Sequence, residues 1–173
     1  MIEIGGKPII WHIMKIYSHY GINDFIICCG YKGYLIKEYF SNYYLHNGDL
    51  IIDYQSQKKI SVKNDIEPWK ISLIDTGEGA DTAERLFKVK KYIKEEKFCF
   101  TYGDGVADIN IKSLIDFHIN SKSIATLTAV QPPGRFGALS LNDNIVNQFQ
   151  EKTDGLNSWI NGGFFVLDKK IFD

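Results

Sequence analysis

The sequence predicts an α/β fold: a three-layer sandwich with a mostly parallel sheet, helices on both faces, and an antiparallel extension in the last third. Over the first two thirds of the 173 residues, segments with helical spacing alternate with short apolar runs. This alternation favours parallel strands joined by helices. In the last third, strand-like runs are separated by turn residues instead. The length suits one domain, residues 1–173, with a substantial core.

The helices are expected where apolar residues recur at spacings of three and four. Pro8 is suited to the first position of the first helix, Gly21 follows its end, and Asn110 is a candidate N-cap for the fourth. In chain order, the helical segments are 8–20, 33–44, 83–95 and 110–121. The inward residues of the third are expected to be Leu86, Val89, Tyr92 and Ile93.

The strands are expected where short apolar runs lie between turn residues. Along the chain these runs are 24–30, 49–54, 69–77, 98–101, 124–132, 137–141, 145–152 and 160–168. The polar segment 55–65 would be a loop or a hairpin. Nucleotide-binding sheets of this kind normally open with a strand and a glycine-rich turn, whereas this chain opens with a helix. The pattern therefore resembles one whose first unit is missing.

Charge and composition limit the kinds of partner that the protein can have. The net charge is −1 and the basic residues are scattered, which argues against a nucleic-acid surface. No apolar run approaches the roughly 20 residues of a membrane span, and no signal peptide is evident. Cys28, Cys29 and Cys99 lie in apolar runs without zinc spacing, so we interpret them as buried, reduced thiols of a cytoplasmic protein.

A carboxylate at a strand end is the first candidate site. Asp104 stands between Gly103 and Gly105, directly after the apolar run 98–101. Ligands of open α/β sheets bind at the carboxyl ends of strands, and glycines let a ligand approach the backbone closely. An aspartate there suits Mg²⁺, which prefers oxygen ligands. The alternative is a tight turn in which the aspartate caps backbone amides.

Two later stretches add polar groups at strand ends. Glu151 and Lys152 end one run, and a lysine offers a compact positive charge for a phosphate. Asn161, Gly162 and Gly163 begin the next run, and an asparagine has donors and an acceptor for sugar hydroxyls. The alternatives are a solvated charge for Lys152 and a hairpin turn for Asn161-Gly162.

The stretches IEIGGKPIIWHIMKIYSHYGINDFIICCGYKGYLIKEYF, FCFTYGDGV, LTAVQPPGRFGAL, FQEK and INGGFFVLD resemble the glucose-1-phosphate cytidylyltransferase family of sugar nucleotidyltransferases. The similarity runs along almost the whole chain. It implies a nucleotide-diphospho-sugar transferase-like fold, Mg²⁺ as cofactor, and conversion of CTP and α-D-glucose 1-phosphate to CDP-glucose and diphosphate. The product would serve the synthesis of surface polysaccharides, including lipopolysaccharide O-antigen, and of deoxysugars.

The resemblance also implies residue roles. Asp104 would bind Mg²⁺ and Lys152 would hold the sugar phosphate, so these two are the expected catalytic residues. The substrate-binding residues would be Glu151, Asn161, Gly162, Gly137, Thr76, Gly77 and Gly103. For Asp75-Thr76-Gly77, which would line the nucleotide pocket, a simple turn between strand and helix remains an equal alternative.

The chain departs from the family in three places. Met1 aligns after the family's first strand, its Gly-x-Gly-Thr-Arg loop around the triphosphate and a phosphate-binding lysine. Asp173 precedes a family segment that supplies a second magnesium-binding aspartate. In TAERL, Ala83 and Glu84 replace glycines, and a carboxylate there would repel a triphosphate unless it faces away. We therefore expect these 173 residues alone to bind Mg-CTP poorly and turn over slowly or not at all.

Two other functions remain open. A nucleotide-sugar-dependent glycosyltransferase also uses a strand-end aspartate, although Asp104 and Asp108 do not form its usual Asp-x-Asp. A catalytically silent remnant would only bind sugar phosphate or pack against a full-length copy. The strand edge expected in the last third is compatible with a homo-oligomer.

Overall fold

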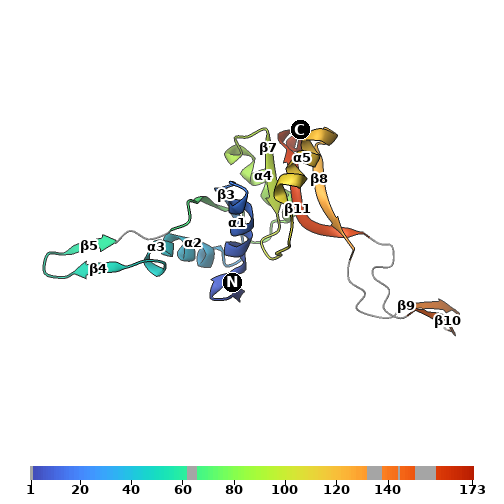
Figure 1. Cartoon of the computed structure of the whole chain (residues 1–173), viewed down its shortest axis with the longest axis horizontal. Helices are drawn as coiled ribbons and strands as arrows, with labels where there is room; N and C mark the ends of the chain where they lie inside the picture. The colour runs from blue at the N-terminus through green and yellow to red at the C-terminus, as the bar shows by residue number, and fades with distance from the viewer. Residues whose placement is uncertain (1, 62–65, 132–137, 144, 151–158) are drawn as a thin grey trace. The chain divides into compact units, whose positions relative to one another are not determined.

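The computed structural model describes residues 2–61, 66–131, 138–143, 145–150 and 159–173. They belong to two compact units (Figure 1). The N-terminal unit comprises Met1–Glu95 with Phe172, and the C-terminal unit comprises Glu96–Ile171 with Asp173. A single domain over residues 1–173 stays a prediction.

The N-terminal unit is built around one parallel strand pair. Its elements are β1 (Glu3–Ile4), β2 (Lys7–Pro8), α1 (Ile9–His19), β3 (Asp24–Cys29), α2 (Gly33–Ser41), α3 (Tyr43–His46), β4 (Leu50–Asp53), β5 (Lys58–Ser61), β6 (Lys70–Asp75), α4 (Thr82–Val89) and the 3₁₀ turn η1 (Lys90–Tyr92). Strands β3 and β6 pair in parallel, from Asp24 opposite Lys70 to Cys29 opposite Asp75. Their carboxyl ends therefore lie side by side, where parallel sheets bind ligands.

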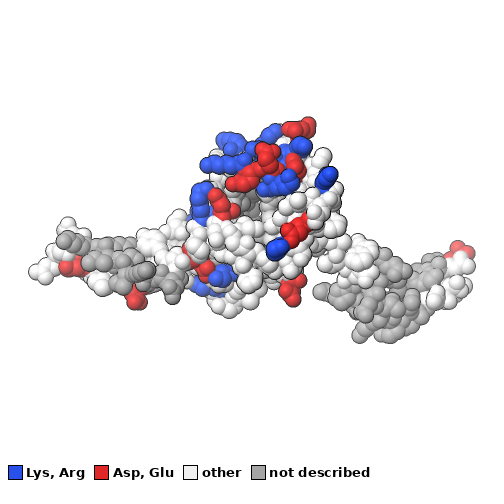
Figure 2. All heavy atoms as spheres, turned by 45° about the horizontal axis from the view of Figure 1, so that its top comes forward, with Lys and Arg blue, Asp and Glu red and all other residues white. Residues whose placement is uncertain are grey.

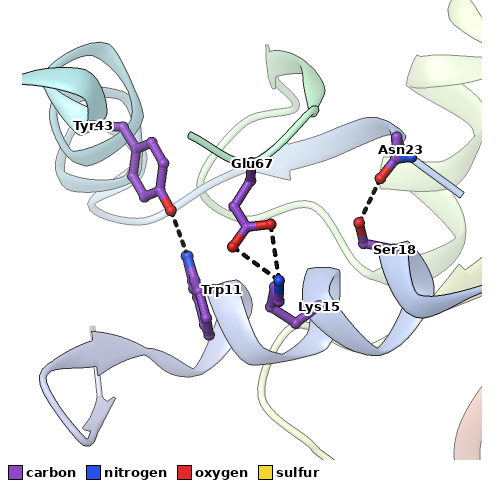
Figure 3. Close-up of polar contacts among 6 residues, drawn as sticks. All are labelled: Trp11, Lys15, Ser18, Asn23, Tyr43 and Glu67. Atoms are coloured by element: carbon purple, nitrogen blue, oxygen red, sulfur yellow. Dashed lines mark hydrogen bonds and ion pairs between the residues drawn. The ribbon is translucent and has the colours of Figure 1, made fainter. Parts of the chain in front are cut away.

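The core of this unit lies between α1 and the parallel pair. Met14, Ile27 and Cys29 are buried, and partly buried apolar residues of α1, α2, β3 and β6 pack against them. Polar contacts tie α1 to its neighbours (Figure 3). Trp11 Nε1 donates to the Tyr43 hydroxyl at 2.7 Å, and Lys15 Nζ donates to both carboxylate oxygens of Glu67 at 2.9 Å.

The local structure of this unit confirms one sequence prediction and departs from the sequence analysis at two places. Residues 55–65 contribute β5, which forms an antiparallel hairpin with β4, so the hairpin alternative is confirmed for the described part. The sequence did not predict the β1–β2 hairpin, whose turn residues Gly5 and Gly6 have φ values of 57° and 75°. Placing Tyr92 on the inward face was wrong, because α4 narrows to η1 after Val89 and Tyr92 is 40% exposed.

The C-terminal unit is antiparallel. Its elements are β7 (Lys97–Thr101), α5 (Ile111–Ser121), β8 (Ala125–Val130), β9 (Ala138–Asn142), β10 (Ile145–Gln150), β11 (Ile160–Asp168) and the 3₁₀ turn η2 (Lys169–Phe172). Strand β11 lies between β7 and β8 and pairs antiparallel with both, and β9 pairs with β10. Helix α5 begins at the predicted cap, since Asn110 Oδ1 accepts the Ser113 N–H at 2.9 Å.

The α/β class and the antiparallel last third are confirmed. Among the described strands, parallel pairing is confined to β3–β6, and the other described pairs are antiparallel. Basic and acidic side chains lie interspersed on the face shown in Figure 2. No helix in the described part of the chain is both long and apolar enough to span a membrane.

Candidate active site

A buried threonine, Thr76, links the ends of β3 and β6 by hydrogen bonds. Thr76 is 1% exposed. Its backbone N–H donates to Cys29 O at 2.8 Å, and its Oγ1 donates to the same carbonyl at 2.9 Å. Asp75 Oδ1 accepts the N–H of Gly77, which has a φ of 88°. Asp75-Thr76-Gly77 therefore forms an Asx turn after β6 that is hydrogen-bonded to the end of β3. Its contact with a nucleotide stays a prediction.

Two cations reach this turn from α4, and the sequence analysis named neither. Arg85 Nη1 donates to Thr76 Oγ1 at 2.7 Å, and Nη2 donates to Glu78 O at 3.0 Å. Lys88 Nζ donates to Thr76 O at 2.8 Å. The guanidinium also occupies the space beside Gly30, where an added Cβ would lie 2.4 Å from Nη1. The available signal was the basic residue in TAERL, at the start of the helix that follows β6.

Glu84 has a local structural role. Its Oε2 accepts the Asp81 N–H at 3.2 Å, while Asp81 Oδ1 accepts the Glu84 N–H at 2.8 Å. This reciprocal pair is a capping box, which satisfies two N–H groups at the start of α4. The carboxylate that replaces a family glycine thus has an electrostatic partner in its own helix terminus.

The end of β7 presents Asp104. The residue is exposed and has no hydrogen-bond or ion-pair partner among the residues that the structure describes. A Cβ added at Gly103 or at Gly105 would meet nothing within 4 Å, so the carboxylate is approachable from both sides. The capping interactions of the turn alternative are not seen in the described part of the chain.

Asp104 suits a magnesium ion that keeps most of its water. The described residues contain no group of three or more His, Cys, Asp or Glu side chains that could hold a metal. Mg²⁺ commonly takes one or two protein carboxylates and completes its shell with water and substrate phosphates. The open Asp104 carboxylate fits that role as one oxygen ligand.

The Asn161 stretch lies beside the residues that precede Asp104. Asn161 Nδ2 donates to the Tyr102 hydroxyl at 3.0 Å, and Asn161 Oδ1 accepts the Gly163 N–H at 2.8 Å. Thr101 Oγ1 donates to Gly163 O at 2.7 Å. The end of β7 and the start of β11 thus form one polar cluster, which brings together two of the stretches singled out in the sequence.

Gly162 and Gly163 are required by the strand geometry itself. A Cβ at Gly162 would lie 2.7 Å from Thr128 Oγ1 and 3.1 Å from Val130 Cγ1. Gly163 has a φ of 82°. The register between β11 and β8 shifts between Asn161 and Phe165, and such bulges re-aim side chains beside binding sites. Packing therefore accounts for Gly162, and the positive φ accounts for Gly163. A sugar contact of Gly162 stays a prediction.

Three predicted site residues, Gly137, Glu151 and Lys152, lie outside the described residues. Their roles, and a shared hollow between Asp104 and Lys152, stay predictions. The cysteines are free thiols: Cys29 is buried, and Cys28 and Cys99 are half-buried. Burial raises the pKa of Cys99 to about 11, so its thiol stays protonated at neutral pH.

Polar groups at the strand ends of an α/β sheet are typical of ligand-binding enzymes of this fold class. Comparison with known proteins identifies the family. The nucleotidyl transferase family matches residues 1–173. Glucose-1-phosphate cytidylyltransferase of Salmonella typhimurium is 55% identical over 175 residues, which cover 100% of this chain and 68% of that protein. The probable glucose-1-phosphate cytidylyltransferase of Bacillus subtilis is 46% identical, over 98% of this chain and 66% of that protein.

Solved structures agree on the fold. HddC from Yersinia pseudotuberculosis complexed with GMP-PN superposes with a TM-score of 0.64 at 23% identity, over 99% of this chain and 68% of that chain. UDP-glucose pyrophosphorylase complexed with UDP-glucose gives a TM-score of 0.63 at 14% identity, over 99% and 68%. The predicted nucleotide-diphospho-sugar transferase-like fold is thereby confirmed. The chain belongs to the nucleotidyl transferase family.

Proposed function

We propose that this chain functions as a glucose-1-phosphate cytidylyltransferase, which converts CTP and α-D-glucose 1-phosphate to CDP-glucose and diphosphate. The observation that carries the proposal is the 55% identity to the Salmonella cytidylyltransferase over the whole chain. The polar cluster that links Asn161 and Tyr102 at the end of β7, two residues before Asp104, supports it.

The reaction needs positioning and charge neutralisation more than covalent chemistry. A phosphate oxygen of glucose 1-phosphate forms a bond to the α-phosphorus of CTP, the bond to the β-phosphate oxygen breaks, and diphosphate leaves. Bound Mg²⁺ would supply positive charge to the phosphates. Asp104 would hold that ion, Lys152 would hold the sugar phosphate, and Glu151 and Asn161 would bind glucose hydroxyls.

We assign the turn Asp75-Thr76-Gly77, at the end of β6, to the CTP pocket. Thr76 and Gly77 would line it. Arg85 would add a positive charge there, since the guanidinium has five N–H groups and the contacts with Thr76 and Glu78 use two of them.

A nucleotide panel tests the proposal. CTP, UTP, dTTP and GTP are each incubated with glucose 1-phosphate and Mg²⁺, and nucleotide-sugar and diphosphate are quantified. The panel is run on the 173-residue chain and on a chimera flanked by the parts of the Salmonella protein outside the 68% match. We expect CDP-glucose from CTP, with faster turnover in the chimera because the family's phosphate loop adds N–H donors and an arginine.

Other outcomes separate the alternatives. A preference of the chimera for another nucleotide would refute the cytidylyltransferase assignment. In a separate incubation with CDP-glucose and no CTP, transfer of glucose to an acceptor with release of CDP would favour the glycosyltransferase. Binding of glucose 1-phosphate with no product in either protein would favour the silent remnant.

The same proposal sets the biological context. CDP-glucose would feed surface polysaccharide and deoxysugar synthesis in the cytoplasm, where CTP is made. The three free thiols are compatible with a reducing compartment. We further propose that the protein is a homo-oligomer, which light scattering of the purified protein would test.

A further inference from the structure

Tyr102 is the residue that joins the end of β7 to Asn161, and the resemblance to the family assigns it no role. Its ring packs edge-to-face against Phe100 and Phe165, with centroid distances of 6.2 and 5.7 Å and interplanar angles of 80° and 77°. A Cβ built at Gly163 would lie 3.3 Å from Tyr102 Cδ2, so only glycine leaves the ring full room. The ring is therefore fixed by packing, yet Tyr102 remains 39% exposed.

Two hydrogen bonds fix the orientation of the Asn161 carboxamide, one with Tyr102 and one with Gly163. Asn161 Nδ2 donates to the Tyr102 oxygen, and Asn161 Oδ1 accepts the Gly163 N–H. A reversed carboxamide would place its NH₂ group against the Gly163 N–H, two donors facing each other, and would lose this bond. Gly163 therefore selects one orientation of the carboxamide, and Tyr102 holds its other end.

The pair has unused hydrogen-bonding capacity. An asparagine carboxamide has two N–H donors and an oxygen that accepts twice, and one of each is used here. The Tyr102 oxygen accepts from Asn161, so its own O–H remains available, and no described residue accepts it. The pair thus presents two donors and one acceptor from rigid positions at an exposed site.

This mixture suits sugar hydroxyls better than phosphate. A hydroxyl both donates and accepts, so it can use the N–H, the O–H and the Asn161 oxygen. A phosphate only accepts, and the Asn161 oxygen would face its negative charge. The chemistry of the pair therefore favours the hexose ring of the substrate.

We propose that Tyr102 is a positioning residue for the sugar, which holds the Asn161 carboxamide in the orientation that binds a hexose hydroxyl. The inference rests on the proposed function for the identity of the sugar. It adds a residue outside the Asp104, Lys152, Glu151 and Asn161 set, and a reason for the exposed tyrosine directly before Gly-Asp-Gly.

Tyr102→Phe tests the inference because it removes one oxygen and keeps the ring packing. In the active protein of the nucleotide panel, we expect the KM for glucose 1-phosphate to rise about 3- to 10-fold, the loss of one hydrogen bond. The KM for CTP and kcat should change less than about 2-fold, because the proposal places Asn161 at the sugar and not at the nucleotide. Tyr92→Phe is the matched control, since Tyr92 is 40% exposed and lies on η1 in the other unit.

A double-mutant cycle separates positioning from an independent contact. If Tyr102 acts through Asn161, Tyr102→Phe combined with Asn161→Ala should bind glucose 1-phosphate no more weakly than Asn161→Ala alone. Effects that multiply, an unchanged KM in Tyr102→Phe, or an equal loss for CTP would each overturn the inference. Thermal unfolding checks that Tyr102→Phe retains the stability of the parent, since the ring contacts are unchanged.

Calorimetric titration with glucose 1-phosphate distinguishes a failure of the positioning role from a failure of the proposed activity. If the parent makes no CDP-glucose but binds glucose 1-phosphate, and Tyr102→Phe weakens that binding, the proposed activity fails and the positioning role stands. If CDP-glucose forms normally and binding is insensitive to Tyr102→Phe, the positioning role fails and the activity stands.

Discussion

At the end of the β3–β6 pair, Thr76 is 1% exposed and its polar atoms bond to Cys29, Arg85 and Lys88. At the end of β7, Asp104 is exposed and has no hydrogen-bond or ion-pair partner among the described residues. The two strand ends follow similar apolar runs, yet the polar atoms of Thr76 are paired with neighbouring residues and the Asp104 carboxylate has no partner among the described residues. We therefore expect unused hydrogen-bonding capacity, rather than strand-end polarity alone, to mark a binding group.

The largest expected effect tests this contrast at Asp104. Asp104→Asn keeps the shape and removes the charge, so kcat/KM for CDP-glucose formation should fall by about 100-fold or more, as for loss of a main electrostatic group. The melting temperature should stay near that of the parent, because the carboxylate is exposed. The control is Asp108→Asn, four residues further on. Equal activity of the Asp104 variant and its control would remove Asp104 from the site.

The second effect concerns packing behind Asn161. Gly162→Ala places a Cβ 2.7 Å from Thr128 Oγ1 and 3.1 Å from Val130 Cγ1, both on stiff β-branched side chains. The free energy of unfolding should fall by about 2 kcal/mol, measured by urea denaturation. Gly103→Ala, which meets nothing within 4 Å, should leave that energy nearly unchanged. Equal losses in both variants would contradict the assignment of Gly162 to packing.

The third effect concerns the end of the β3–β6 pair, where the polar atoms of Thr76 are hydrogen-bonded. Gly30→Ala would push its Cβ against the Arg85 guanidinium, which must leave Thr76 and the Glu78 carbonyl. Because arginine is flexible, the free energy of unfolding should fall by only about 1 kcal/mol. Gly79→Ala, with open space around it, is the control in the same unfolding experiment. A loss of stability as large as that of Gly162→Ala would show that Arg85 cannot move aside.

The smallest effect is a pH dependence from His118, which is fully buried and shares a 2.9 Å hydrogen bond between Nδ1 and Thr126 Oγ1. Burial lowers the pKa of this imidazole, Lys97 lowers it further, and Asp168 opposes them. The unfolded chain therefore binds the proton more readily. Stability should be full above the ordinary pKa of about 6.5 and decline as pH falls below it.

The measurement is the melting temperature at about pH 7 and about pH 5. His118→Gln should show a smaller difference between the two than the parent protein. A parent melting temperature that rises on acidification would mean that His118 accepts its proton in the folded state.

Much of the local structure could be read from the sequence because its causes are local. The cap at Asn110 and the strand before Asp104 depend on residues a few positions apart. The end of α4 was misread because the apolar period continues to Ile93, while the backbone tightens after Val89. The β1–β2 hairpin was missed because its strands have only two residues each.

What the sequence by itself determined is the class of protein and the identity of its exposed strand-end carboxylate, since spacing and motif order suffice for both. Only the tertiary structure decided which polar groups already have hydrogen-bond partners. Arg85 meets Gly30 across 55 positions, and Tyr102 meets Asn161 across 59. Such contacts depend on the register of strands that are distant in the chain, and register is set by packing of the whole sheet rather than by any short segment.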